Sequence, residues 1–184
     1  MNSPRSFLRV LKGATLIGIP LFAIWLTTPA TAQTPSANTR PVVAIDGAVT
    51  PERIPDWILW REVFGLVTRL ADKSPDSGRS YWANSLGLSP AQVAQLVAQG
   101  RAWRDEEGQM NLQARNLIGA SGAPLSPTAR VKLHQIQAAK ESRILARRDS
   151  LRGSIGTDAF ERIRSFARLH IAPTIKVGGA AVNR

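Results

Sequence analysis

The sequence of 184 residues contains no cysteine, two histidines and a single tyrosine. Without cysteine, the chain can form no disulfide, no catalytic thiol and no cysteine-based metal site. The two histidines, His134 and His170, fall on different predicted helices and have no acidic side chain at ligand spacing. A protein metal site usually needs three or four such ligands, so we expect neither a metal nor another cofactor.

Sequence motifs that carry catalysis are also missing. The chain has no glycine-rich phosphate loop and no nucleophile elbow, and most of its serines occupy helix-capping positions. Asp105, Glu106 and Glu107 form the one dense acidic cluster, but successive positions of a helix point in different directions. We interpret Asp105 and Glu106 as a solvated face and Glu107 as part of a helix seam. The protein is therefore predicted not to be an enzyme.

The first 32 residues have the order of features that is typical of a secretory signal peptide. Three cations precede the apolar run 14–26, and small residues follow at Ala30 and Ala32. We expect residues 1–32 to be the signal peptide, with cleavage near Ala32 and an exported, periplasmic mature protein. Residues 13–32 are uncharged and long enough to span a bilayer, so a membrane-anchored form is the alternative.

Beyond the signal peptide, the excess of positive charge lies in the C-terminal third. Residues 33–129 contain nine Lys/Arg and nine Asp/Glu, whereas residues 130–184 contain twelve and four. This excess predicts an anionic surface, or acidic or unfolded protein clients, as the partner; a solvated helix face is the alternative. Export argues against nucleic acid, while peripheral membrane contact and a homodimer stay open. The candidate partner-binding residues lie on or beside the outer face of one predicted helix: Arg143, Arg148 and Arg152.

The pattern of apolar residues predicts an all-α protein. Three segments are expected after the signal peptide: an extended or disordered N-terminal tail over 33–50, a helical domain over 51–172 and a C-terminal tail over 173–184. Four helices are expected within the domain: one ending near Lys73, one from Ser89, one from Ser126 to about Arg152 and one from Thr157. Ser89-Pro90-Ala91-Gln92 has the residues of a capping box, which marks a helix start.

The second and third predicted helices are expected to form a long antiparallel hairpin, because the connection between them is short. Apolar residues of the second helix recur every seven residues, as in a heptad seam. Seam partners would then have numbers that add to about 247. Four pairs define this register: Trp103 with Ile144, Leu96 with Leu151, Glu107 with Lys140 and Gly100 with Arg147. The missing side chain of Gly100 would leave room for Arg147, which we therefore exclude from the partner-binding face.

Two short stretches resemble known groups of proteins. Asp46-Gly47-x-x-x-Pro51-Glu52-x-Ile54-Pro55-Asp56 resembles the start of small secreted bacterial proteins of no assigned activity. Leu88-Ser89-Pro90-Ala91-Gln92 is similar to the L-T-x-x-Q motif of Spy-type periplasmic stress chaperones. A second, partial copy begins at Leu125, with Ala129 in place of the glutamine. The resemblance implies a helical, basic, exported protein whose cradle-shaped dimers hold unfolding clients.

These observations favour a protein that works by binding. The first hypothesis is a non-enzymatic exported binding protein, namely an envelope chaperone or stress adaptor. The second is a structural or interaction subunit that is held at an anionic envelope surface through its basic helical face.

Overall fold

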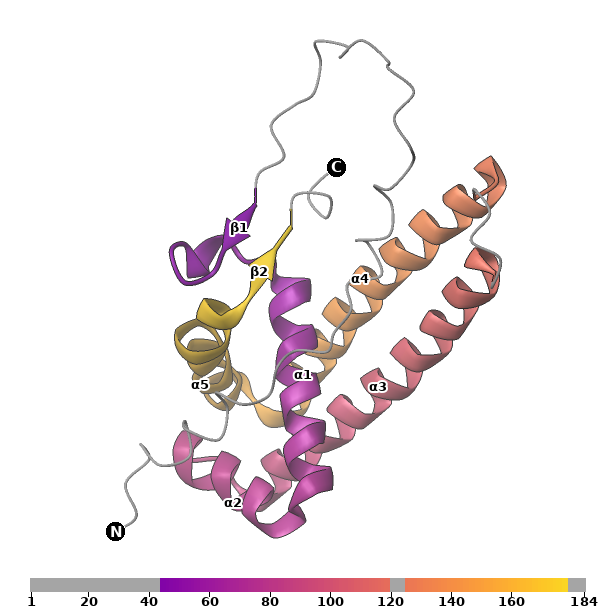
Figure 1. Ribbon diagram of the computed structural model, residues 1–184. Coiled ribbons are helices and arrows are strands. Elements are labelled where there is room, and N and C mark those ends of the chain that lie inside the picture. Colours follow the sequence, from indigo (N-terminus) through magenta and orange to yellow (C-terminus); the bar gives the residue numbers. More distant parts are fainter. Residues whose placement is uncertain (1–43, 120–124, 179–184) are drawn as a thin grey trace. The chain divides into compact units, whose positions relative to one another are not determined.

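The computed structural model describes residues 44–119 and 125–178. The chain divides into two compact units, of which the larger is Asp46–Ile175. The described residues of the smaller unit are few, namely 44–45 and 176–178. The predicted signal peptide, most of the predicted N-terminal tail, part of the connection between the second and third predicted helices and part of the predicted C-terminal tail lie outside the described residues. The prediction of an all-α protein is confirmed, because helices dominate the described chain (Figure 1).

Helix α1 (Asp56–Lys73) follows a short 3-10 turn, η4 (Pro51–Arg53), and is the central helix of the larger unit. It contacts α2, α3, α4 and η5. Its large apolar residues recur at helical spacing and are almost fully buried: Leu59, Trp60, Val63, Phe64 and Val67. Because neighbours surround α1 on several sides, its apolar surface extends around most of the helix rather than forming one stripe.

Helix α2 (Pro75–Leu86) lies between the first two of the four predicted helices. Proline at its first position is compatible with a helix start, since that amide has no partner within the helix. Gly78 allows close contact with α1, because a Cβ there would lie 2.7 Å from the Leu70 carbonyl oxygen. The helix ends at Gly87, whose φ of 61° is left-handed.

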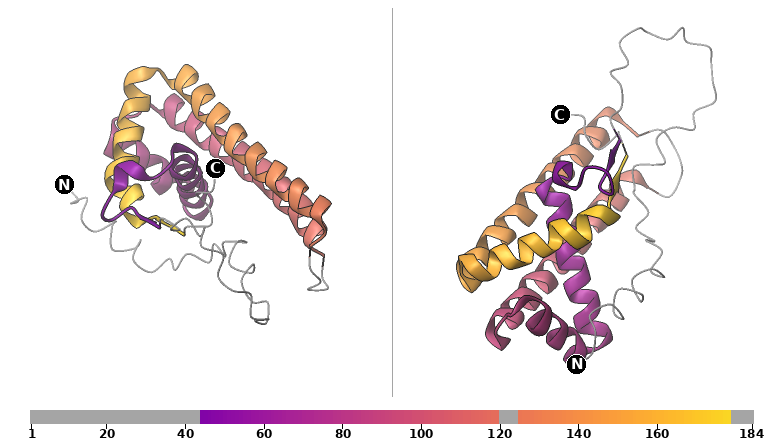
Figure 2. Two further views of the ribbon diagram at one scale, coloured as in Figure 1. Left: turned by 90° about the horizontal axis from the view of Figure 1, so that it is seen from above. Right: turned by 90° about the vertical axis from the view of Figure 1, so that its left-hand side faces the viewer.

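Helices α3 (Pro90–Ile118) and α4 (Pro127–Ile155) lie side by side and run in opposite directions (Figures 1 and 2). The capping box at Ser89 is present, with both of its reciprocal hydrogen bonds. Ser126 caps α4 by accepting from the Ala129 amide. Gln92 Nε2 of α3 donates to the Ile155 carbonyl oxygen at 2.9 Å, which ties the start of α3 to the end of α4.

The chain ends in short elements rather than one continuous helix. Helix α5 (Thr157–Phe166) runs into a π-helical turn, η5 (Ala167–Ile171), and a 3-10 turn, η6 (Ala172–Thr174). Strands β1 (Ile45–Asp46) and β2 (Lys176–Val177) pair with each other. Both strands fall in segments that were expected to be tails, and two-residue strands leave too little alternation for a sequence pattern to reveal.

Asp56 joins three parts of the larger unit at the first turn of α1. Its carboxylate accepts from Arg148 Nη1 of α4 at 3.0 Å and from Arg168 Nη2 of η5. Arg168 Nη1 also donates to the carbonyl oxygens of Pro51 and Ile54 at 3.1 and 2.7 Å. These contacts fix the entry to α1 against elements about 90 to 117 residues further along the chain.

Candidate functional site

The hairpin of α3 and α4 has two differently covered halves. Near the α3 start, Val93, Leu96 and Trp103 are buried, as are Ile144 and Leu151 of α4. The first 17 residues of α4, in contrast, include no buried residue, because Ile144 is the first. We call residues 108–118 and 127–140 the distal arm. Figures 1 and 2 show this end of the hairpin away from α2 and α5.

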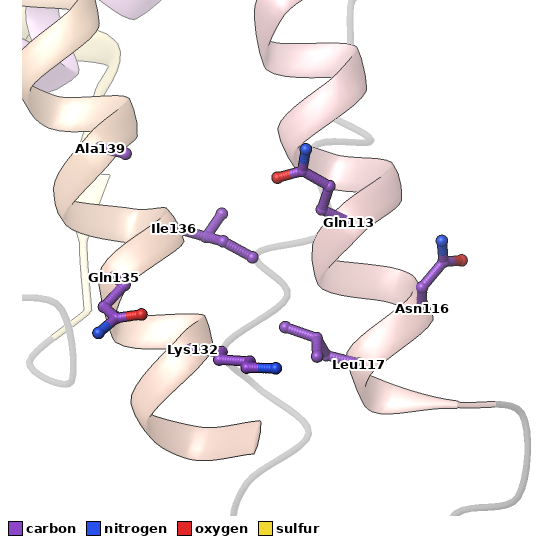
Figure 3. A pocket seen from close by; sticks show the side chains of 7 residues that line it. All are labelled: Gln113, Asn116, Leu117, Lys132, Gln135, Ile136 and Ala139. Atoms are coloured by element: carbon purple, nitrogen blue, oxygen red, sulfur yellow. The ribbon is translucent and has the colours of Figure 1, made fainter. Parts of the chain in front are cut away.

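The distal arm contains an open groove of about 560 Å³ between α3 and α4. Its walls come from both helices: Gln113, Asn116, Leu117, Lys132, Gln135, Ile136 and Ala139. Figure 3 shows Leu117 of α3 pointing toward Lys132 and Ile136 of α4 across the gap. The two apolar side chains are only half-buried. The groove therefore presents apolar carbon to solvent between two rigid helices.

Two strongly exposed apolar side chains lie outside the groove, on the outer faces of the two helices. Leu112 of α3 is 58% exposed and Val131 of α4 is 56% exposed. At about 100° per residue, Leu112 lies roughly 140° around α3 from Leu117, and Val131 lies roughly 140° around α4 from Ile136. Single exposed apolar side chains of this kind are common on protein surfaces, so the groove itself is the candidate binding surface.

The charge around the groove has one sign. No Asp or Glu occurs between residues 108 and 140, a stretch with four Lys/Arg. Lys132 lies in the groove itself. Arg143 lies 11 residues further along α4, on the same helical stripe as Lys132 and Ala139, and is exposed. The groove side of α4 therefore carries a cation at each end.

Arg143 lies beside the ion pair of Arg147 and Glu106, whose one carboxylate only partly offsets the positive charge of the two arginines. Arg147 donates to Glu106, with Nε to Oε2 at 3.1 Å, and to Gln99 Oε1 at 3.1 Å. The hydrogen bond from Arg147, together with the charge of Arg143, holds the pKa of Glu106 below its usual value. Two guanidinium groups thus face one carboxylate, so the cluster keeps a net positive charge. The expectation that Glu106 belongs to a solvated face is wrong, because Glu106 is half-buried in this pair.

The three predicted partner-binding arginines do not share one face of α4. Arg143 lies on the groove side, as described above. Arg148 pairs with Asp56 at 3.0 Å and with Asp149 at 2.8 Å, and its side chain is 23% exposed. Arg152 places its guanidinium 5.8 Å from the ring centre of Phe160. Arg148 was expected to act without affecting the fold; in the structure it connects α4 to α1.

Two seam pairs of the predicted register have surroundings that differ from the expectation. Lys140 Nζ donates to Asn111 Oδ1 at 2.6 Å, one turn beyond Glu107, although Glu107 and Lys140 line the same small cavity. Burial lowers the pKa of Lys140, against the opposing charge of Glu107. At Gly100, a Cβ would lie 3.2 Å from the Phe64 carbonyl oxygen of α1. The glycine therefore permits close contact with α1, rather than making room for Arg147.

The histidine and tryptophan side chains lie at the surface or in the core rather than in a binding site. His134 and His170 are both exposed, and within residues 44–119 and 125–178 no three His, Asp or Glu side chains are grouped as a metal site would need. Trp60, Trp82 and Trp103 are buried in the core, and Trp57 is half-buried. Among the helices of the described chain, none is long and apolar enough to cross a membrane.

Sequence reasoning found Arg143 but missed the groove beside it. The usable signal was the run of 33 residues without a carboxylate between 108 and 140, in which Leu, Ile and Val still recur. No protein-family model, curated protein or solved structure matches this chain. A functional assignment consequently depends on the groove and its charge.

Proposed function

We propose that the protein is a non-enzymatic exported binding protein, an envelope chaperone or stress adaptor, whose clients bind in the groove of the distal arm. The observation that carries this proposal is the open apolar groove lined by Leu117 and Ile136. The order of charged, apolar and small residues in 1–32 supports export.

Burial of apolar surface supplies the driving force for such binding. Each Å² of apolar surface removed from water contributes about 25 cal/mol, so covering two half-exposed leucine-sized side chains contributes on the order of 1–3 kcal/mol. A client with several apolar side chains would gain this free energy by covering the walls of the groove. The affinity stays modest, because the client loses conformational freedom.

An aggregation assay tests the proposal. The purified protein should delay the light scattering of unrelated unfolding proteins when present at equal molar ratio. Leu117→Glu should abolish most of this protection, because it places a charge inside the groove. Leu169→Glu is the matched control, since Leu169 is 70% exposed on η5, away from the arm. Equal protection by both variants would contradict the assignment of the groove as the client site.

The second candidate is a structural or interaction subunit held at an anionic envelope surface. The observation that favours it is the charge split, with twelve Lys/Arg against four Asp/Glu in residues 130–184. Flotation with vesicles that contain an anionic phospholipid tests this function. Salt-sensitive binding to anionic but not to zwitterionic vesicles, without protection of any client, would favour this candidate over the chaperone.

A further inference from the structure

We infer that the groove of the distal arm takes an amphipathic α-helix whose carboxylates lie along the edge that faces α4. The inference rests on the proposed function and makes it more specific, because it names the chemistry of the client. It depends on three features of the described residues: the shape of the groove, the sign of its charge and the different chemistry of its two walls.

The shape favours a helix as occupant. The groove runs between two antiparallel helices, with Leu117 and Ile136 at its floor (Figure 3). A third helix laid along such a groove would place its apolar stripe between the two, as ridges fill grooves in helix packing. Leu117 and Ile136 would then contact the apolar stripe of the occupant. An isolated pair of helices leaves this third position open.

The charge favours an acidic occupant over a second copy of this chain. Four Lys/Arg and no Asp or Glu lie between residues 108 and 140. Two distal arms packed against each other would bring like charges together, which opposes association. An occupant with carboxylates would instead meet complementary charge at Lys132 in the groove and at the net positive cluster around Arg143.

The two walls differ, and this difference gives the occupant an orientation. The α4 wall carries Lys132, with Arg143 further along the same side of the helix, whereas the α3 wall carries the neutral amides of Gln113 and Asn116. At the level of Arg143, α3 carries Glu106, which is paired with Arg147. The two cations are 11 residues apart, about 16 Å along a helix at 1.5 Å per residue. An occupant that runs alongside α4 would meet both with carboxylates three turns apart. Its other edge would carry neutral polar side chains.

Binding of designed peptides tests the inference. The first probe is a fluorescent 18-residue helical peptide with a leucine stripe and glutamates three turns apart on one edge. The second replaces those glutamates by lysine, and the third places two prolines in the middle of the first. Fluorescence anisotropy at low salt should give the glutamate peptide at least about tenfold tighter binding than either other peptide, a difference of about 1.4 kcal/mol.

Variants of the protein locate the site. Lys132→Glu and Arg143→Glu should each weaken binding of the glutamate peptide about three- to tenfold and strengthen binding of the lysine peptide. Arg115→Glu is the matched control, because Arg115 is an exposed cation of the same arm on the outer side of α3. At physiological ionic strength, where the Debye length is about 8 Å, it should change neither affinity by more than about twofold, because its charge lies on the side of α3 away from the occupant and is screened by salt.

Several outcomes would overturn the inference. Equal affinity for the glutamate and lysine peptides would refute the charge argument, and equal affinity for the proline peptide would refute a helical occupant. A dimer, seen as a doubled mass by light scattering and lost in Leu117→Glu, would show that a second copy fills the groove. Binding to anionic vesicles but to no peptide would assign the arm to a lipid surface. If clients are still protected from aggregation in any of these cases, the proposed function stands without the inference.

Discussion

The two ends of the α3–α4 hairpin have similar helical patterns but differ in what covers them. At one end, Leu96 and Leu151 are fully buried beneath neighbouring helices. At the other end, Leu117 and Ile136 occupy equivalent seam positions, yet they stay half-buried beside an open groove. Along the distal arm the seam is only partly closed, because Met110 and Ala114 are buried whereas Leu117 and Ile136 border the open groove.

This difference separates stability from binding along one pair of helices. The covered end contains the larger apolar side chains, including Trp103, and holds the hairpin together. Among the described residues of the distal arm, Met110 and Ala114 are the only buried ones, so the surface around the groove can vary in chemistry at small cost to the fold. The predictions below test this division, beginning with the largest expected effect.

Trp103→Ala should cause the largest loss of stability. Trp103 is 3% exposed, so its truncation should lower the free energy of unfolding by about 3–5 kcal/mol. Urea denaturation followed by circular dichroism measures this. Trp103→Phe is the control and should cost less, because the indole Nε1 has no hydrogen-bond partner within the described chain. A loss under about 1 kcal/mol for Trp103→Ala would contradict the assignment of this end as core.

The same substitution at two positions of α4 compares the two ends directly. Ile144 is 1% exposed, and Ile144→Ala should lower the free energy of unfolding by about 2–4 kcal/mol. Ile136 lies two turns earlier at the half-buried groove, so Ile136→Ala should cost about 1 kcal/mol or less. Matched melting curves give both values. Equal losses would mean that the distal arm is as well packed as the covered end.

Asp56→Asn should destabilise the covered end without affecting the arm. The substitution weakens the contacts to Arg148 and Arg168, and the expected loss is about 1–2 kcal/mol because the carboxylate is partly exposed. Asp72→Asn is the control, since Asp72 pairs with Arg101 and Arg104 at the surface. Thermal melting should show a clearly smaller change for Asp72→Asn, and the reverse order would contradict the role of Asp56.

Local signals in the sequence located most helix ends. The Ser89 capping box has its two hydrogen bonds, and Gly156 ends α4 with a φ of 84°, because capping chemistry depends on neighbouring residues alone. The predicted end of this helix, near Arg152, is three residues short, because Gly153 continues α4 to Ile155. The residues next to a glycine do not reveal whether it continues a helix or ends it, because tertiary contacts decide between the two.

Local sequence patterns could not predict contacts between segments that are distant along the chain. The close approach at Gly100 depends on Phe64, and the pairing of Arg148 depends on Asp56, 92 residues away. The sequence identified Arg143 as a cation on a helix, but its relation to Lys132 and the groove required knowing which side of α4 is left uncovered by α1. The charge pattern was available from the sequence, whereas the exposed seam was not.

Replacing Glu106, which lies between the two ends of the hairpin, should change the stability least and in a way that depends on pH. Its hydrogen bond from Arg147 lowers the pKa of Glu106 in the folded protein, so the unfolded chain binds the proton more tightly. This contribution to stability is present above the unfolded pKa, near 4.5, and is lost as pH falls through the lower folded pKa. At pH 6, the free energy of unfolding of the wild type should exceed that of Glu106→Gln by under about 1 kcal/mol, and this difference should vanish toward pH 3. Asp105→Asn is the exposed neighbouring control in urea titrations across this range. A difference between wild type and Glu106→Gln that persists at pH 3 would show that the pair does not act through this proton.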